Sequence, residues 1–246
     1  MGSLNLPVLE QHVETNVRQF HKTRLAALQS LKLDQLLKRK NPYLFRSKNL
    51  VTAGEFIKYL VDDHLSSAGE TQFGNFLEEL AIHVSEQVDG GRKSAVKGID
   101  LEFDRDGERH VVAIKSGPNW GNSSQIAKMR QDFIRAAQTL RTSNSRLKIK
   151  AINGCCYGRD ERPDKGDYHK LCGQQFWAYI SLRSSLYLDL IKPLAHEAEK
   201  QSTLFRETYA SKVNLFTVDF GQRFCSKGPI DWQALVRFNS GAKGST

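Results

Sequence analysis

Two carboxylates and a lysine lie on either side of a predicted tight turn at Asp106-Gly107. The residues before this dipeptide alternate in polarity and those after it are rich in β-branched types, so segment 98–116 predicts a β-hairpin. A strand places alternate side chains on one face, so Asp100 and Glu102 share a face and Asp100 can approach Lys115 on the partner strand. Carboxylates bind hard cations such as Mg²⁺, and a neighbouring lysine can stabilise an attacking hydroxide or the charge that develops on a phosphate. The hairpin therefore predicts metal-dependent phosphodiester hydrolysis, with a solvated hairpin of ordinary surface charges as the competing interpretation.

Helices are predicted before the hairpin. Apolar residues at three-to-four spacing indicate a helix over residues 8–31, and a second helical run ends in Lys38-Arg39-Lys40, before a break at Asn41-Pro42. We expect this N-terminal helical arm to pack on the main body or on a second subunit. The predicted organisation is an arm at residues 1–40, a main domain at 41–239 and a flexible tail at 240–246.

The remaining elements complete a mixed α/β pattern. Thr52 and Glu55 form a predicted capping box, and the helix that follows is expected to break at Ser66-Ser67-Ala68-Gly69. The later elements that we expect are a helix from Thr71 to Gln87, a helix capped by Ser123, a strand at Leu147–Asn153 and helices beyond Gly173. This order predicts an α/β or α+β fold in which a central mixed sheet is flanked by helices.

The composition favours a basic protein with a polyanionic partner. Lys and Arg number 36 against 27 Asp and Glu, which gives a formal net charge of +9 and a pI near 9.4. The four cysteines contain no CxxC pair, so we expect reduced thiols, as in a reducing cytoplasm, rather than a disulfide framework or a zinc site. The N-terminus has no signal-peptide pattern and no segment is apolar for the length of a bilayer span, so no membrane partner is expected.

Several short motifs carry a family resemblance that extends over roughly residues 41–194. They are Asn41-Pro42-Tyr43-Leu44-Phe45-Arg46, Glu70-Thr71-Gln72-Phe73-Gly74 with Leu77-Glu78, Gly98-Ile99-Asp100, the segment from Ile114 to Gln125, Asn153-Gly154-Cys155-Cys156-Tyr157-Gly158 and Gly173-Gln174-Gln175-Phe176-Trp177. Together they resemble the PD-(D/E)xK nucleases, and among these a small group of type II restriction endonucleases that cut interrupted palindromes of the RGGNCCY kind. The resemblance implies a PD-(D/E)xK nuclease core with an N-terminal helical extension. It also implies a Mg²⁺-dependent homodimer that cuts both strands of double-stranded DNA, without a nucleotide cofactor, in the cytoplasm of a prokaryote.

The resemblance assigns roles within and beside the hairpin. Asp100 matches the first metal-binding aspartate, Lys115 matches the motif lysine, and the main-chain carbonyl of Ile114 is expected as a further metal ligand. Glu78 is expected to add a helix-borne acid to the catalytic and metal site, because its flank of the helix is the less polar one; a surface carboxylate is the alternative. Ala113 departs from the family pattern, since an acidic residue is expected two positions before the lysine.

Two segments are predicted to contact DNA. The basic lead into the hairpin offers Arg92, Lys93 and Lys97 for phosphates, with a solvated loop as the alternative. The segment after the lysine leads to a helix N-terminus, where main-chain amides bind phosphate and where Asn and Gln side chains can read adenine; an ordinary turn and cap is the alternative. Its candidate DNA-binding residues are Ser116, Asn119, Trp120, Asn122, Ser123, Ser124 and Gln125.

The alanine at position 113 leaves two explanations. The chain is an inactive variant made by engineering, which we favour because the surrounding residues match a working site, or another acid such as Glu78 or Glu102 completes the metal site. Two other functions stay open beside restriction: a repair or structure-specific nuclease with the same core, and a DNA-binding protein without catalysis.

Overall fold

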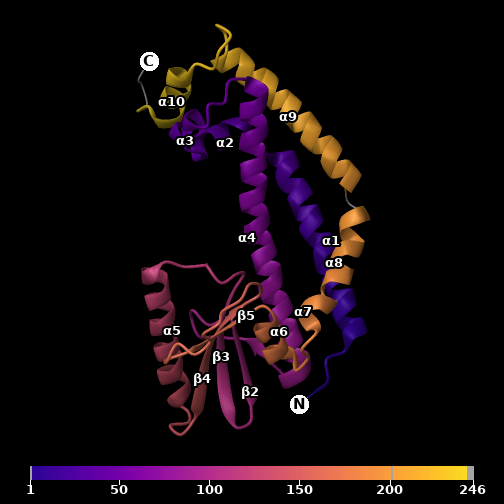
Figure 1. The fold of residues 1–246 in the computed structure, drawn as a ribbon, viewed down its shortest axis with the longest axis vertical. Helices are drawn as coiled ribbons and strands as arrows, with labels where there is room; N and C mark the ends of the chain where they lie inside the picture. The colour runs from indigo at the N-terminus through magenta and orange to yellow at the C-terminus, as the bar shows by residue number, and fades with distance from the viewer. Residues whose placement is uncertain (1, 201, 243–246) are drawn as a thin grey trace. The chain divides into compact units, whose positions relative to one another are not determined.

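A mixed α/β fold is present in the computed structural model, which describes residues 2–200 and 202–242 (Figure 1). Its helices are α1 (Leu6–Ser30), α2 (Leu33–Arg39), α3 (Pro42–Ser47), α4 (Ala53–Asp89), α5 (Ser123–Arg141), α6 (Gln174–Ser181), α7 (Leu186–Asp189), α8 (Ile191–Lys200), α9 (Ser202–Phe224) and α10 (Trp232–Ser240). Its strands are β1 (Arg92–Lys93), β2 (Leu101–Arg105), β3 (Glu108–Lys115), β4 (Lys148–Cys155) and β5 (His169–Cys172). None of the described helices is both long and apolar enough to cross a membrane.

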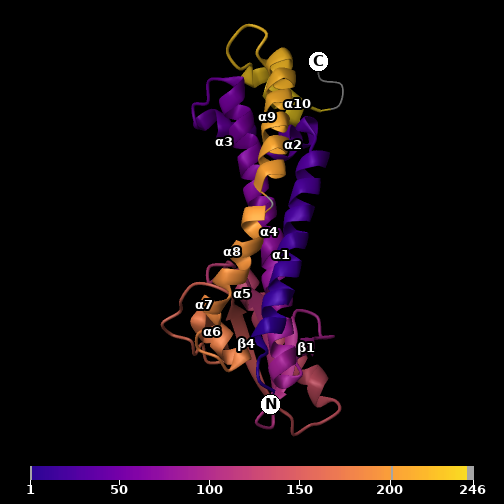
Figure 2. The same ribbon diagram turned by 90° about the vertical axis from the view of Figure 1, so that its right-hand side faces the viewer.

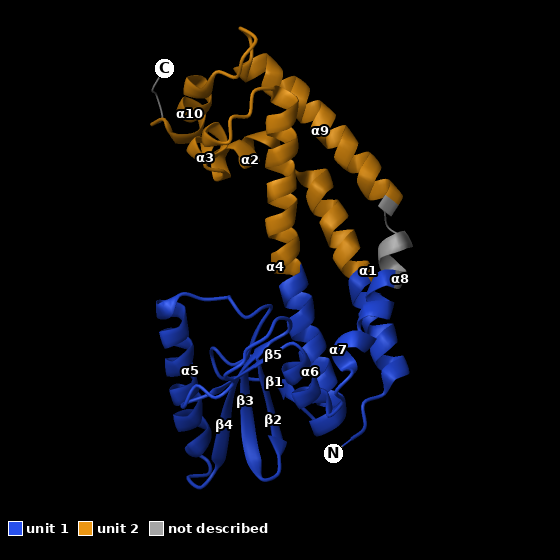
Figure 3. Cartoon of the chain, viewed as in Figure 1, with its two compact units in different colours: residues 1–17, 73–197 blue, residues 18–72, 198–246 orange. Residues whose placement is uncertain are grey.

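The chain divides into two compact units, residues 1–17 with 73–197 and residues 18–72 with 198–246 (Figure 3). All five strands belong to the first unit. The divisions fall inside α1 and α4, whereas we expected a boundary near residue 40. Ser240, where the predicted tail begins, is the last residue of α10, and residues 243–246 lie outside the described part of the chain.

The sheet has the strand order β1-β2-β3-β4-β5 and is mixed, as predicted. The pairs β1–β2 and β2–β3 are antiparallel, whereas β3–β4 and β4–β5 are parallel. The predicted hairpin is confirmed: Asp106 and Gly107 have φ values of 52° and 76°, the left-handed conformations that a two-residue hairpin turn of type I′ requires. The carboxyl ends of β3, β4 and β5 therefore lie along one edge of the sheet.

Different helices cover the two faces of this sheet. On one face α5 contributes Met129, Phe133 and Ala136 to a cluster with Val111 and Ala113. The other face packs against α4 and α6, which lies beside α7 in both views (Figures 1 and 2). The members of that second cluster include Leu101, Phe103, Val112, Ile114, Ile152, Leu80, Val84, Phe176, Trp177 and Ile180. The hairpin strands are thus held rigidly from both sides.

The second unit is a helical cluster in which the aromatic rings of Phe56 and Phe220 stack at a centroid distance of 4.7 Å. The predicted N-terminal arm buries its apolar face within the chain. Leu9 and Val17 of α1 belong to the core of the first unit, and Leu28 belongs to the core of the second.

Two predictions about elements are wrong, and two short strands were missed. Residues 66–69 do not break the helix, because α4 is continuous and the hydroxyls of Ser67 and Thr71 donate to carbonyls one turn back, at 2.9 and 3.1 Å. Helix α5 is capped by Asn122 and not by Ser123. The short strands β1 and β5 were not predicted, because two to four residues are too few to show a period.

The face of β3 that packs on α6 carries a buried histidine. His110 is 4% exposed, and its Nδ1 lies 2.5 Å from the hydroxyl of Tyr179. Burial lowers the pKa of His110 below its ordinary value.

We expect this histidine to make the free energy of unfolding fall on acidification. Below pH about 6.5 the unfolded chain takes up a proton that the folded chain refuses, so stability is full above that pH and is lost down to the folded pKa. The slope from one such group is at most about 1.4 kcal/mol per pH unit. Urea unfolding of the protein and of His110→Gln between pH 7.5 and 5.5 measures it. An equal slope in both proteins would contradict the assignment.

Candidate active site

The hairpin brings Asp100 and Lys115 together, as predicted. Lys115 Nζ lies 3.8 Å from Asp100 Oδ2, and the side chains are 32% and 23% exposed. Asp100 is fixed by two main-chain contacts: its N–H donates to the carbonyl of Val112 at 2.9 Å, and its Oδ2 accepts from the N–H of Ile114 at 2.7 Å. The pair is ordered and still open to solvent, as a site for a phosphate must be.

Ala113 occupies the position next to this pair. Leu101 pairs with Val112 in the β2–β3 register, and the N–H of Asp100, just before β2, donates to the carbonyl of the same Val112, so Asp100 lies beside the last residues of β3. Ala113 and Lys115 are two residues apart in β3, so their side chains point to the same face of the strand. Ala113 is 1% exposed and its methyl group offers no ligand. A carboxylate here would adjoin both members of the pair.

The carbonyl of Ile114 points towards the same place. The N–H and C=O of one strand residue point to the same side, and the N–H of Ile114 binds Asp100. The carbonyl therefore faces the edge at which Asp100 lies. The role of this carbonyl as a metal ligand stays a prediction.

Glu78 lies on the flank of α4 that approaches the end of β3. One turn earlier, a Cβ on Gly74 would stand 2.7 Å from Ser116 Oγ, which shows how closely the helix approaches the residue after Lys115. Glu78 is 28% exposed in its side chain, and its Oε1 lies 3.5 Å from Lys93 Nζ. Burial, and then the charge of Glu78, raise the pKa of Cys156 to about 12. Glu78 is therefore beside the site and is already paired with a lysine.

Glu102 does not join the pair. It lies opposite Val111, two residues further from Lys115 along the face, and its carboxylate is 2.8 Å from Arg92 and 3.6 Å from Arg109. Two guanidinium groups thus hold it away from a metal at Asp100. Within residues 2–200 and 202–242, no three His, Cys, Asp or Glu side chains converge as a metal centre.

A buried amide lies beside Ala113; from the sequence, Asn153 was only part of a resemblance motif and had no role assigned to it. Asn153 is 1% exposed and is the β4 partner of Ala113. Its Nδ2 donates to the carbonyl of Ala113 at 3.1 Å, and its Oδ1 accepts from Trp120 Nε1 at 3.1 Å. The ring of Trp120 in turn lies 5.4 Å from Lys115 Nζ. Asn153 therefore positions the loop that follows the lysine; the only signal in the sequence is a polar residue within a β-rich run.

Replacing Asn153 by alanine is expected to lower the free energy of unfolding by about 1–3 kcal/mol, because buried partners lose their hydrogen bonds. Urea titration measures the change. Asn119→Ala, on the same loop but exposed, is the matched control and should change stability by less than about 0.5 kcal/mol. Equal stability of both variants would contradict the positioning role.

Several of the predicted DNA-binding residues already form hydrogen bonds or ion pairs within the chain. Asn122 and Gln125 form a reciprocal capping box on α5, with two hydrogen bonds of 3.0 Å. Arg92 and Lys93 are paired with Glu102 and Glu78. Ser116 is partly buried and Trp120 contacts Lys115. The remaining candidates, Lys97, Asn119, Ser123 and Ser124, are exposed, as are Arg92, Lys93, Asn122 and Gln125. The structure thus gathers the segment after Lys115 around the pair.

The family model of type II restriction endonuclease EcoO109I matches residues 8–202 of the chain. The chain belongs to this family. No curated protein matches the chain. Membership makes the chain a type II restriction endonuclease and DNA its partner. The mixed sheet with helices on both faces is consistent with that fold.

The donors of this endonuclease fit a weakly held Mg²⁺. Mg²⁺ binds proteins through one or two carboxylates and completes its octahedron with water and substrate phosphate. Asp100 and the carbonyl of Ile114 would hold it, and Ala113 leaves the place of a second carboxylate without a ligand. The residues present would thus hold the ion with fewer charges than a site with a second carboxylate.

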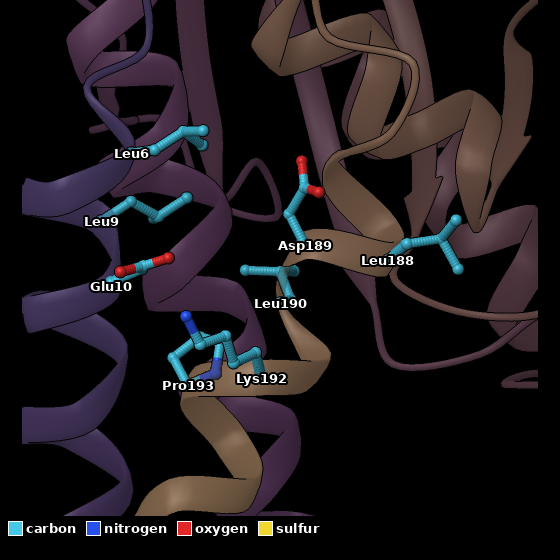
Figure 4. A pocket seen from close by; sticks show the side chains of 8 residues that line it. All are labelled: Leu6, Leu9, Glu10, Leu188, Asp189, Leu190, Lys192 and Pro193. Atoms are coloured by element: carbon cyan, nitrogen blue, oxygen red, sulfur yellow. The ribbon is translucent and has the colours of Figure 1, made fainter.

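The described residues of the first unit line at least two pockets. One of about 270 Å³ is lined by Leu6, Leu9 and Glu10 of α1 and by the segment 188–193 without Ile191 (Figure 4). It shares no residue with the Asp100–Lys115 pair. The other, of about 580 Å³, lies at the carboxyl ends of β4 and β5.

Proposed function

We propose that the chain is a Mg²⁺-dependent homodimer that cleaves both strands of an interrupted palindrome of the RGGNCCY kind, and that Ala113 makes this cleavage slow. The observation that carries the proposal is the approach of Asp100 to Lys115 at 3.8 Å at the end of the hairpin, where Ala113 stands two residues before the lysine. A palindrome presents two equivalent half-sites, which a two-fold dimer reads with one surface.

The chemistry follows from the positions of these groups. Mg²⁺, when bound, polarises a water molecule and the phosphate. The carboxylate of Asp100 would bind the ion, and the hydrogen bond from the N–H of Ile114 fixes the orientation of that carboxylate. Lys115 carries a positive charge 3.8 Å from that carboxylate and so stabilises an attacking hydroxide or the charge that builds on the phosphate.

Incubation with unmethylated plasmid and Mg²⁺ tests the proposal. We expect discrete fragments that accumulate slowly and only at enzyme excess. A smear or nicking would indicate a repair or structure-specific nuclease instead. Sedimentation of the free protein and of its complex with cognate duplex should give a dimer, and a monomer in both would contradict the symmetric reading.

A second candidate is sequence-specific DNA binding without catalysis, which Ala113 favours because it removes a ligand from the metal. A gel shift on one sequence with no cleavage at any Mg²⁺ concentration would establish this candidate and exclude the first.

A further inference from the structure

A polar hollow of about 580 Å³ opens at the carboxyl ends of β4 and β5, beside the catalytic pair. Crevices at the carboxyl ends of parallel strands are the usual ligand sites of such sheets. The polar side chains of its lining are Tyr157, Arg159, Asp160, Glu161, Gln174, Gln175 and Tyr187.

Hydrogen bonds join the hollow to the catalytic strand. The N–H of Cys156 donates to the carbonyl of Lys115 at 2.9 Å, and the N–H of Tyr157 donates to that of Ser116 at 3.0 Å. The Tyr157 ring packs so closely on Gly117 that a Cβ there would lie 2.4 Å from it. Neighbouring strands are about 5 Å apart, and the major groove is about 12 Å wide. Side chains of the hollow are therefore within reach of the base edges beside a phosphate held at Lys115.

The loop that forms the rim is held in place. Asp160 accepts from Lys165 at 3.0 Å and lies 3.4 Å from Lys170, whose Nζ donates to the carbonyl of Pro118 at 2.8 Å. Burial raises the pKa of Asp160, but the hydrogen bonds from Lys165 and the main chain outweigh burial and hold that pKa below its ordinary value. The backbone next to Arg159 is thus anchored to the loop that follows the catalytic lysine.

Arg159 itself is exposed at the rim, and its guanidinium has no ion pair or hydrogen bond among the described residues. Gln174 differs, because its amide donates to the carbonyl of Ser184. Because the loop is anchored and the guanidinium has no partner among the described residues, Arg159 can bind a ligand that offers two hydrogen-bond acceptors in one plane. Guanine offers such a pair, O6 and N7, in the major groove, and arginine binds it with two hydrogen bonds.

We infer that Arg159 is a specificity-determining residue that reads one guanine in each half-site through the major groove. The inference rests on the proposed function, since it needs a specific duplex bound at Lys115. A contact to phosphate is the alternative chemistry, and it carries no sequence information.

Selection from a randomised duplex pool tests the inference without cleavage. In the presence of Ca²⁺, duplexes that bind are selected separately with four proteins: the unmodified chain, Arg159→Ala, Arg159→Lys and Arg162→Ala. The affinity of each protein is then measured for the enriched duplex and for a scrambled duplex. Arg162 is the matched control, since it is exposed on the same loop and does not line the hollow. Circular dichroism confirms that the variants are folded.

We expect Arg159→Ala to lose the guanine preference at one position of each half-site, with a roughly 5- to 150-fold smaller ratio of specific to scrambled affinity. Arg159→Lys should keep part of it, and Arg162→Ala should enrich the unchanged site. An unchanged site with Arg159→Ala, or equal weakening on both duplexes, overturns this inference alone. A pool in which the unmodified chain enriches nothing overturns the proposed function and the inference with it.

Discussion

Ala113→Glu is expected to raise the single-turnover rate of Mg²⁺-dependent cleavage by about 10²-fold or more. The new carboxylate would stand two residues before Lys115 on the same face of β3, where a bound metal would otherwise lack a second charged ligand. Metal polarisation contributes several kcal/mol to such reactions, and each 1.4 kcal/mol is a factor of ten in rate. Quench-flow on a cognate duplex at enzyme excess measures the change, and Mn²⁺ titration should show tighter binding.

Ala113→Gln is the matched control, because it has the same size without the charge. It should destabilise the packing against α5 as much as glutamate does while leaving cleavage slow. Full activity of the chain with Ala113, further reduced by Glu78→Ala, would instead show that the helix-borne acid completes the site. The side-chain pair of Glu78 with Lys93 would then have to open.

Lys115→Ala, made in the Ala113→Glu background, is expected to reduce the cleavage rate by about 10²- to 10³-fold and to change duplex affinity only a few-fold. The ammonium acts on one phosphate during reaction, whereas affinity is distributed over many contacts. Asp100→Asn should act in the same direction by weakening the metal. Cleavage rates and fluorescence anisotropy on the same duplex separate the two effects.

Lys148→Ala provides the comparison, since Lys148 is an exposed lysine at the amino end of β4, opposite the site end of the sheet. It should leave the cleavage rate unchanged. If Lys115→Ala cut as fast as Lys148→Ala, the hairpin would not be the catalytic site.

The parts predicted well from the sequence are those that depend on local rules. Asp106-Gly107 determines the hairpin turn, and strand alternation then brings Asp100 to Lys115 without further information. The inward flank of Glu78 followed from helical spacing, and exposed Glu79 agrees with it.

The parts that could not be predicted depend on partners distant in sequence. The role of Asn153 requires the parallel pairing of β4 with β3, which no local pattern determines. The unbroken α4 has a different cause, which is local: Ser67 and Thr71 donate their hydroxyls to carbonyls four residues back within the helix instead of ending it. A count of charges also could not predict that Arg92 pairs with Glu102 and that Lys93 pairs with Glu78.

Those two ion pairs change how salt should act on DNA binding. A basic side chain without an acidic partner in the protein can neutralise a DNA phosphate directly. This contact releases a cation from the DNA and steepens the dependence of affinity on salt concentration. Arg92 and Lys93 already hold Glu102 and Glu78 as internal counterions. A phosphate that takes either base must displace a carboxylate of the same chain and leave that negative charge beside the DNA. The salt slope of binding should therefore report fewer released ions than the excess of nine positive charges suggests.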